Sequence, residues 1–555
     1  MKVIRTRWLV SIVVLVLVAA GVAWALLGSS PRRTASIGGQ PVRIVEGGAV
    51  SFAAGEPTGF NPNTSKNNGT DVQNAVENVY PSVFRTHPDL VVRLDRDVMD
   101  SAEVTGERPQ TVTYRIRRDA IWSDGVPISA ADFTYLWRHA NGADKRIDVA
   151  ATTGYRDIGS VTGSADGKTV TVVFARPFAE WRSLFYNLLP SHYVTRQPGG
   201  WNTGLDRNPQ QIPSGGPFRI ASHAQGQSLT LERNPRYWRP RAHLDRIVLR
   251  FLTDAGAQAD ALRNGEVDVI YPGTQLDVVQ TVQRLPGVDT GLRFGLRFDH
   301  LTFNLAHPVL ADLAVRRAIS MAIDRQQLLE RTVGQFSSSA QVLGNRIWLT
   351  GQPAYQDHAG GHGRGDVAAA TDLLERAGWA KGADGIWAKG GRKLRLRFST
   401  MNEDTIRVQL GLLLQDQLKK AGIALEIHNV PAKELFEDRL PHGNFDLVEF
   451  AWIGNPFAVS GSRDAYTTRS GSNYGGFADP VVDALFDRAT TELDPARSAA
   501  LANQIDRKLW EGLPNVPLFQ RPTFIAWRDT LRNVEDNPSV EGPLWNAEAW
   551  GYARQ

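Results

Sequence analysis

The stretch VTYRIRRDAIWSDGVPISAADFTYLWR, residues 112–138, predicts a strand, a turn and a capped helix in immediate succession. Val112, Tyr114 and Ile116 alternate with polar residues, which is the period of a half-buried strand. The Ser-Asp-Gly that follows at 123–125 favours a turn, because Ser and Asp side chains bond nearby backbone and Gly accepts a positive φ. Ser129 and Asp132 then have the spacing of an N-terminal cap. An apolar helical stripe is formed by Phe133, Leu136 and Trp137.

Further along the chain, helical patterns alternate with short strand patterns, which indicates a layered α/β fold. Asp312 and Asp366 each precede a helical run, and Asp324 with Gln327 has the form of a capping box. The clearest unit spans residues 403–427, where a helix ends in Lys-Lys and Gly and an alternating strand follows. Its apolar stripe consists of Ile406, Leu410, Leu413, Leu414 and Leu418.

The run from Trp122 to Asp132 resembles the signature of the family 5 extracellular solute-binding proteins, the receptors of oligopeptide, dipeptide and nickel ABC importers. Further motifs of that family occur in order between roughly residues 45 and 535, and the stretch 80–100 resembles an actinobacterial branch that contains a mycobacterial lipoprotein linked to phosphatidylinositol mannoside synthesis. These motifs are Gly215–Phe218, Leu231–Trp238 and Leu262–Val269; Phe303–Leu305, Val315–Ala318 and Ala322–Arg325; and Leu373–Trp379 with Leu418–Ile423.

The resemblance implies a two-lobed α/β fold of the periplasmic-binding-protein type with an extra inserted domain. We predict that lobe I comprises residues 42–60, 212–297 and 520–555, that the inserted domain comprises 61–211, and that lobe II comprises 298–519. Chain crossings near 297 and 519 would form a hinge. Closure of two lobes around a ligand is a known domain motion, and pockets favour domain interfaces.

The N-terminus predicts a membrane segment. Three basic residues within positions 1–7 precede an apolar run from Trp8 to Leu27, which spans about 30 Å as a helix. A cleaved signal peptide is the alternative, since Ala23-Trp24-Ala25 has the small-x-small form, but this tripeptide lies inside the run. We favour a transmembrane helix at 8–27, with residues 1–7 in the cytoplasm, a linker at 28–41 and the main domain outside the cell membrane.

Composition limits the function classes. The chain has 555 residues, 42% of them hydrophobic and 22% charged, which is typical of globular proteins with more than one domain. The net charge is only +4 and basic residues do not interleave with aromatics, so a nucleic-acid partner is not expected. The absence of cysteine excludes disulfides, thiol catalysis and lipidation at a cysteine.

Motifs for catalysis are missing. The sequence contains no GxSxG, HExxH or P-loop motif, so we predict no catalytic residues, no cofactor and no metal site. His358 and His362 form a close pair that could bind nickel or zinc, but the glycine-rich segment around them is better explained as a loop.

The expected ligand site lies where a strand pattern at 447–450 ends. Trp452 follows that strand and starts a loop that contains Asn455 and Phe457, and such loops present side chains to clefts. In the peptide receptors that the chain resembles, an aspartate three residues after the Trp holds the ammonium of the peptide, whereas this chain has Asn455. An ammonium taken out of water needs a compensating charge, and an amide supplies only a dipole.

Two further loops contribute candidate residues to the expected ligand site. Residues 66–68 read Lys-Asn-Asn where some oligopeptide receptors present an acidic residue, so Asn67 and Asn68 are candidate ligand residues. Tyr474 lies in a glycine-containing loop that fits either a cleft or a surface turn. Amides and aromatics suit neutral hydroxylated ligands as well as peptides. The predicted ligand-binding residues are therefore Trp452, Asn455, Phe457, Asn67, Asn68 and Tyr474.

We predict a non-catalytic, extracytoplasmic receptor that captures a small-molecule ligand between two lobes and delivers it to ABC permease subunits. The resemblance implies a peptide as the ligand, and an oligosaccharide or glycolipid is the alternative. A regulatory cell-envelope protein without a transport role is the rival from another functional class, and an exported hydrolase is a third possibility that no motif supports.

Overall fold

The computed structural model describes residues 36–37, 40–41 and 43–554, and residues 45–552 form one compact unit. Outside that unit, β1 (Ser36–Ile37) pairs antiparallel with β2 (Gln40–Pro41). The predicted segments at 1–7 and 8–27, and most of the predicted linker at 28–41, lie outside the described residues. Within the described ranges, no helix has the length and apolar character required to cross a membrane.

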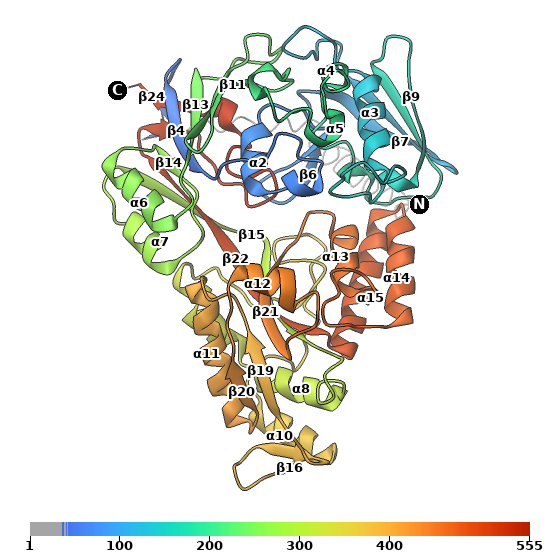
Figure 1. The fold of residues 1–555 in the computed structure, drawn as a ribbon, viewed down its shortest axis with the longest axis vertical. Coiled ribbons are helices and arrows are strands. Elements are labelled where there is room, and N and C mark those ends of the chain that lie inside the picture. The colour runs from blue at the N-terminus through green and yellow to red at the C-terminus, as the bar shows by residue number, and fades with distance from the viewer. Residues whose placement is uncertain (1–35, 38–39, 42, 555) are drawn as a thin grey trace, which may run out of the picture. The chain divides into compact units, whose positions relative to one another are not determined.

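A ten-stranded mixed sheet forms the frame of the compact unit (Figure 1). Its strand order is β11-β12-β13-β4-β14-β22-β15-β21-β19-β20. The strand bounds are β4 (Ala49–Ala54), β11 (Phe218–Ala224), β12 (Ser228–Arg233), β13 (Arg246–Phe251), β14 (Val269–Ile270), β15 (Val288–Phe303), β19 (Arg395–Ser399), β20 (Ala424–Ile427), β21 (Leu447–Ile453) and β22 (Asn515–Arg528). The two longest of these strands, β15 and β22, pair antiparallel and run from one lobe into the other (Figure 1).

The pairing of β15 with β22 is interrupted midway. Phe294 lies opposite Pro522, but the next pair is Phe298 opposite Gln520, so β15 carries extra residues that form a bulge. Gly295 lies in this bulge, and a Cβ at that position would come within 2.4 Å of the carbonyl oxygen of Pro538. The strands that join the lobes are therefore irregular where they cross.

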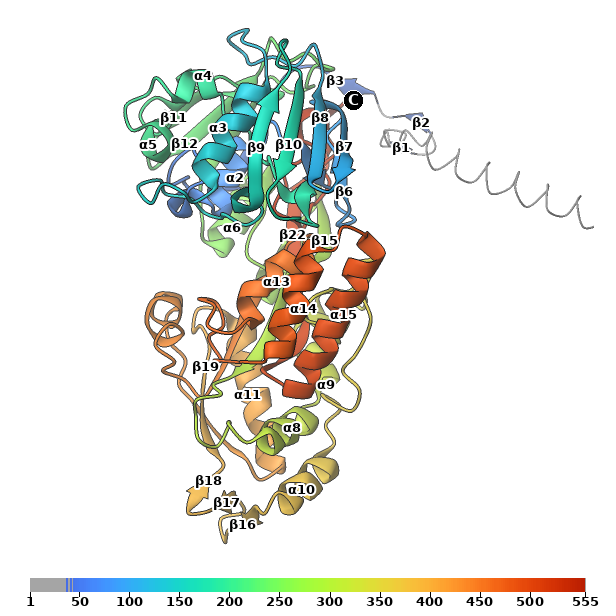
Figure 2. The same ribbon diagram turned by 90° about the vertical axis from the view of Figure 1, so that its right-hand side faces the viewer.

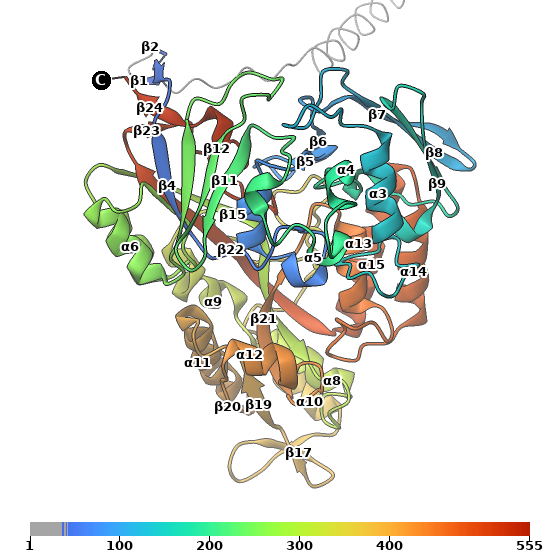
Figure 3. The same ribbon diagram turned by 45° about the horizontal axis from the view of Figure 1, so that its top comes forward.

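The first lobe contains β4, β11–β14 and a separate antiparallel sheet of order β7-β8-β10-β9 (Figures 2 and 3). This second sheet consists of β7 (Met99–Glu107), β8 (Gln110–Ile116), β9 (Ile158–Gly163) and β10 (Thr169–Phe174). The helices of the lobe are α2 (Thr70–Val76), α3 (Ala130–Ala140), α4 (Ser191–Val194), α5 (Gly200–Thr203), α6 (Ala255–Asn264) and α7 (Leu276–Val282). One continuous cluster of buried apolar residues connects both sheets.

The second lobe contains β19–β21 with helices on both sides, and α13, α14 and α15 stand side by side below the β7–β10 sheet (Figure 2). The helix bounds are α8 (Leu313–Ala322), α9 (Arg325–Arg331), α10 (Val367–Arg376), α11 (Thr405–Lys420), α12 (Ala432–Glu434), α13 (Ala458–Tyr466), α14 (Pro480–Thr491) and α15 (Pro495–Gly512). Short strands complete the fold: β3 (Ile44–Val45), β5 (Phe84–Thr86), β6 (Val92–Leu94), β16 (Ala380–Lys381), β17 (Trp387–Lys389), β18 (Arg392–Lys393), β23 (Leu531–Arg532) and β24 (Gly551–Ala553).

The strand, turn and helix predicted for residues 112–138 are confirmed. Val112, Tyr114 and Ile116 are buried in β8, as is Gln110 at its start. Ser129 and Asp132 form a reciprocal capping box at the start of α3. The buried Asp132 carboxylate also accepts hydrogen bonds from the backbone N–H and hydroxyl of Ser191, so this cap also ties α3 to α4.

The predicted caps of the second lobe are confirmed with one difference. Asp312, Asp366 and Asp324 accept hydrogen bonds from the first turns of α8, α10 and α9. At α9, however, the backbone N–H of Asp324 donates to the side-chain oxygen of Gln417 on α11. The predicted capping box had Gln327 as this acceptor. Gln327 instead accepts a hydrogen bond from Gln417 through its Oε1. A helix distant in the chain thus completes the cap.

A cluster of buried charges lies on α11 and on the strands that join the lobes. Arg407 of α11 donates from Nη2 to Asp299 of β15 at 3.0 Å and from Nε to Asp404 at 3.0 Å, and its Nη1 lies 3.8 Å from Glu449 of β21. Arg521 of β22 lies 3.3 Å from Asp299. The side chains of Arg407, Asp299 and Glu449 are almost completely buried, so each depends on the others for charge compensation.

Candidate functional site

The end of β21 and the loop after it contain three of the predicted site residues, Trp452 within the strand and Asn455 and Phe457 in the loop. Trp452 is half-buried, whereas Ile453 at the strand end is 79% exposed. Asn455 accepts a hydrogen bond through Oδ1 from the N–H of Phe457 at 2.8 Å, which turns the chain into α13. Gly461 lies directly against the Asn455 amide, because a Cβ there would be 2.6 Å from Nδ2. The Asn455 side chain therefore has a fixed position on an exposed loop.

A cavity of about 200 Å³ separates this loop from the first lobe. Asn455, Pro456 and Phe457 line it from the second lobe. The opposite walls include Phe84, Val92, Arg182, Tyr186, Val540 and Glu541. A larger opening of about 990 Å³ lies between residues 149–153, 156, 157 and 176 of the first lobe and α13 and α14 of the second. Of the residues expected to bind a ligand, Asn455 and Phe457 thus border space that both lobes line.

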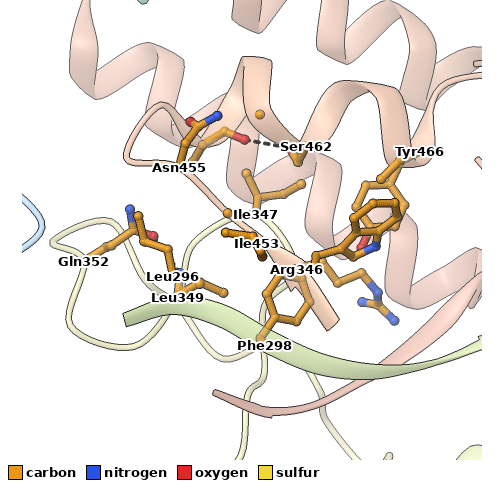
Figure 4. Close-up of a pocket in the computed structure, with 15 residues that line it drawn as sticks. Leu296, Phe298, Arg346, Ile347, Leu349, Gln352, Ile453, Asn455, Ser462 and Tyr466 are labelled. Carbon is orange, nitrogen blue, oxygen red and sulfur yellow. Dashed lines mark hydrogen bonds between the residues drawn. The ribbon is translucent and has the colours of Figure 1, made fainter. Parts of the chain in front are cut away.

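A smaller, apolar cavity of about 40 Å³ lies within the second lobe behind Trp452 (Figure 4). Figure 4 shows Phe298, Leu349 and Ile453 around this cavity, with Arg346 at its edge. The Arg346 guanidinium is buried and bonded to Asn515 within the lobe, so it is already paired. The cavity therefore offers room for a small apolar group and no free charge.

Trp452 is fixed by other aromatic rings. Its indole stacks nearly parallel with Tyr474, at 6.0 Å and 7° between planes, and with His300, at 5.7 Å and 11°. Phe450 meets it edge-on at 5.1 Å. Burial lowers the pKa of His300 to about 3, with smaller contributions from Arg407 and Arg346, so the imidazole of this cluster is neutral. Trp452 and Tyr474 therefore lie side by side as parts of one aromatic cluster.

Asn67 and Asn68 lie elsewhere in the first lobe. Asn67 is buried and accepts a hydrogen bond from the Thr58 hydroxyl at 2.9 Å, so its amide contributes to the loop itself. Asn68 is exposed. Neither side chain lines the cavities described above. The structure therefore groups Trp452, Asn455, Phe457 and Tyr474, and it does not bring Asn67 and Asn68 to them.

Several cavity residues have no signal in the sequence. Tyr186 donates to Glu541, which comes from a segment 355 residues later, at 3.2 Å. The N–H of Thr86 donates to Glu541 at 2.7 Å, and Arg85 lies 3.6 Å from it and also pairs with Glu77. Burial raises the pKa of Glu541 well above its ordinary value, and the neighbouring Glu77 raises it further.

One carboxylate of the first lobe bonds directly to the second lobe. Glu180 accepts hydrogen bonds from the N–H groups of Val459 at 3.0 Å and Ser460 at 2.8 Å, in the first turn of α13. Phe457, at the capping position of α13, provides no side-chain acceptor. Glu180 therefore satisfies N–H groups that the local sequence leaves free, which joins the two lobes next to the cavity.

The histidine pair is divided between two separate contacts. His358 lies 2.7 Å from Asp506, whereas His362 lies 2.8 Å from the Ser320 hydroxyl and stacks on Trp510. In the part of the chain that the structure describes, no group of three or more His, Cys, Asp or Glu residues has a metal-binding arrangement.

Comparison with known proteins adds independent observations. The family model described as "Bacterial extracellular solute-binding proteins, family 5 Middle" matches residues 97–474. The oligopeptide-binding protein OppA of Mycobacterium tuberculosis is 33% identical over 527 residues, which cover 93% of this chain and 88% of the relative.

Two further comparisons concern different ligands. The probable monoacyl phosphatidylinositol tetramannoside-binding protein LpqW of Mycobacterium tuberculosis is 30% identical over 455 residues, which cover 76% of this chain and 69% of the relative. The solved structure of the periplasmic EDTA-binding protein EppA superposes with a TM-score of 0.87 at 30% identity, and it covers 94% of this chain and 100% of its own.

Proposed function

The chain belongs to the bacterial extracellular solute-binding proteins of family 5, and from that premise we propose that it captures peptides between its two lobes and delivers them to the permease subunits of an ABC importer. The observation that carries this proposal is the cavity that Asn455 and Phe457 line from one lobe and Phe84, Arg182 and Tyr186 from the other. The similarity to an oligopeptide-binding protein over most of both chains supports a peptide as the ligand.

Two of the proposed ligand residues border this cavity. Asn455 and Phe457 would contact the ligand directly, and Trp452 with Tyr474 would form the rigid wall behind it. Asn68 is exposed and stays a prediction. Asn67 is assigned to its own loop, since its Oδ1 already accepts from Thr58.

Capture requires the lobes to move, and the strand crossing suits a hinge. The bulge between Phe294 and Phe298, opposite Pro522 and Gln520, weakens regular pairing where β15 and β22 pass between the lobes. We retain the division into 42–60, 212–297 and 520–555 for lobe I, 61–211 for the inserted domain and 298–519 for lobe II as a proposal.

We propose that the ligand leaves unaltered. The groups at the cavity are suited to bind and orient a ligand. They are an amide, aromatic rings, a guanidinium, and the carboxyl of Glu541, which contacts Arg85, Tyr186 and Thr86. We further propose that the apolar run at 8–27 anchors the protein as a helix and holds the receptor close to its permease.

Thermal unfolding of the full chain with synthetic peptides tests the ligand class. A pool of nonapeptides at about 100 times the dissociation constant should stabilise the protein by about 2.7 kcal/mol. Asn455→Ala should reduce this shift, whereas Asn141→Ala, at the end of α3 and outside the cavity, should not. If neither the pool nor any of its individual members stabilises the protein, the proposal is contradicted.

A glycolipid receptor is the second candidate, and the similarity to LpqW favours it. Exposed apolar side chains near the cavity, Ile453 and Val540, could contact acyl or aliphatic groups. Against it, Trp452 is stacked with rings of the protein itself and does not present an open platform for a sugar. Stabilisation by phosphatidylinositol mannosides and not by peptides would favour this candidate.

A further inference from the structure

Three asparagines in this chain are followed directly by glycine: Asn68, Asn141 and Asn264. In such a pair the backbone nitrogen of the glycine can attack the side-chain amide carbon of the asparagine, because glycine has no Cβ to obstruct the approach. A cyclic succinimide forms and ammonia leaves, and water then opens the ring to aspartate or isoaspartate. In a folded protein the rate depends on whether other groups hold the amide and the glycine N–H in place.

Asn264 is held by two hydrogen bonds at the end of α6. The N–H of Gly265 donates to the carbonyl of Leu262 at 3.2 Å, and Nδ2 of Asn264 donates to Oε1 of Glu266 at 3.2 Å. The attacking nitrogen and the amide that it would attack are therefore both engaged. Both bonds must open before the ring can close.

Asn141 is held by one hydrogen bond at the end of α3. Its side-chain oxygen accepts from the N–H of Ala143 at 2.9 Å. Gly142, which has a positive φ of 73°, packs against the next segment, because a Cβ there would lie 2.8 Å from the methyl carbon of Thr152. Both residues of this pair are half-buried. The pair therefore reacts only after this hydrogen bond has opened.

Asn68 has no such restraint. Asn68 and Gly69 are exposed, and in the part of the chain that the structure describes the Asn68 side chain, the Asn68 carbonyl and the Gly69 N–H make no hydrogen bond. A Cβ at Gly69 would meet nothing within 4 Å. The peptide plane between the two residues can turn about ψ of Asn68 and φ of Gly69 without breaking the hydrogen bond from Gln73 to the carbonyl of Gly69. Asn68 can thus reach the reacting geometry at no cost in hydrogen bonds.

We propose that Asn68 is a modification site, which in the native protein converts through a succinimide with Gly69 to aspartate or isoaspartate ahead of Asn141 and Asn264. The reaction consumes one water and releases one ammonia, and it replaces a neutral amide by a carboxylate. It lowers the formal net charge of the chain, which is +4 before modification, by one. Isoaspartate also routes the main chain through the side-chain carbons of residue 68, directly before α2. This inference does not depend on the proposed function.

The expected rates follow from the hydrogen bonds that protect the other two pairs. Opening one bond should slow the reaction about 2- to 13-fold, and opening two about 5- to 160-fold. The full chain is incubated in mildly alkaline water that carries a heavy isotope of oxygen, digested, and analysed by mass spectrometry. The label enters only where water opened a succinimide during the incubation. Asn68 should react faster than Asn141 by the first factor and faster than Asn264 by the second.

Two controls separate the effect of the fold from that of the local sequence. In the urea-unfolded chain the protecting bonds are absent, so the three asparagines should react at similar rates. Gly69→Ala adds a Cβ in open space at an extended φ of −90° and should remove the lead of Asn68 while Asn141 and Asn264 keep their rates.

The native chain decides the outcome. If Asn68 reacts no faster than Asn141 or Asn264 in the folded protein, the inference is overturned. The same lead of Asn68 in the unfolded chain would overturn it as well, because the local sequence and not the fold would then set the rate. Should Gly69→Ala fail to fold, the comparison of the native chain in buffer and in urea gives the answer alone.

Discussion

Replacing Glu180 by alanine removes a carboxylate that caps a helix of the opposite lobe. Glu180 accepts from the N–H groups of Val459 and Ser460, and α13 has no side-chain cap of its own. Loss of a cap costs about 0.5–2 kcal/mol and loss of one hydrogen bond about 0.5–1.5 kcal/mol. The hydrogen bond from Ala179 to the carbonyl of Thr490 persists, so we expect a net cost of about 1–2 kcal/mol to the arrangement in which the lobes touch at these residues, called the closed state below.

This cost should lower peptide affinity about 5- to 30-fold, because less of the protein adopts the closed state. Burial raises the pKa of Glu180, and the bonds from Ser460 and Val459 only partly offset this, so burial disfavours the charged form of the carboxyl. Glu180→Gln, which keeps an acceptor oxygen, should therefore stay within about threefold of the native affinity.

Calorimetric titration with the nonapeptide pool measures the affinity, and small-angle X-ray scattering measures the radius of gyration. Glu103→Ala, on an exposed position of β7 in the same lobe, serves as the control. If Glu180→Ala matches Glu103→Ala in both measurements, the contact does not hold the lobes together. A loss in Glu180→Gln equal to that in Glu180→Ala would show that the charge, and not the acceptor oxygen, makes the contact.

Three other variants test the site and the core. Asn455→Asp keeps the bond to Phe457 and adds a charge, so calorimetry should show about 10-fold tighter binding of free-amine peptides relative to their N-acetylated forms, and an unchanged ratio would remove this residue from the site. The pKa of His300 is about 3 when folded and about 6.5 when unfolded, so the unfolded chain binds the extra proton. The native state therefore loses stability as the pH is lowered from about 6.5 towards 3. We expect the free energy of unfolding in urea to decrease by about 2 kcal/mol less between pH 7 and pH 5 in His300→Gln than in the native chain. Equal decreases would contradict the lowered pKa of His300. Arg407→Met leaves Glu449 buried without a cationic partner and Asp299 with Arg521 alone, and should cost about 3–5 kcal/mol in urea unfolding, far more than Arg331→Met at an exposed position; similar losses would show that the cluster is not coupled.

Features set by neighbouring residues could be predicted from the sequence. Ser129 with Asp132, and Asp312 and Asp366 alone, cap their helices because their acceptors and donors lie within one turn. The capping box predicted at Asp324 is wrong in one partner, because the backbone N–H of Asp324 donates to Gln417 of α11 and not to Gln327. No local pattern reports such a contact.

The site shows the same division. Trp452 lies near the end of β21, and Asn455 and Phe457 follow that strand, so their proximity to one another could be expected from the sequence. Arg182 and Glu541 could not, because their significance depends on which distant segments fold against them. Asn67 was proposed because it is polar, but its side-chain oxygen accepts a hydrogen bond from Thr58 within its own loop.

Recovery of the bound molecule tests most directly whether the two lobes enclose a solute and leave it intact. The full chain is incubated with the nonapeptide pool, freed of excess peptide, denatured, and its ligand identified by mass spectrometry. We predict one peptide per chain, of unchanged mass, with enrichment of particular members of the pool. Shortened or modified peptides, or a protein fraction that carries none, would contradict the account.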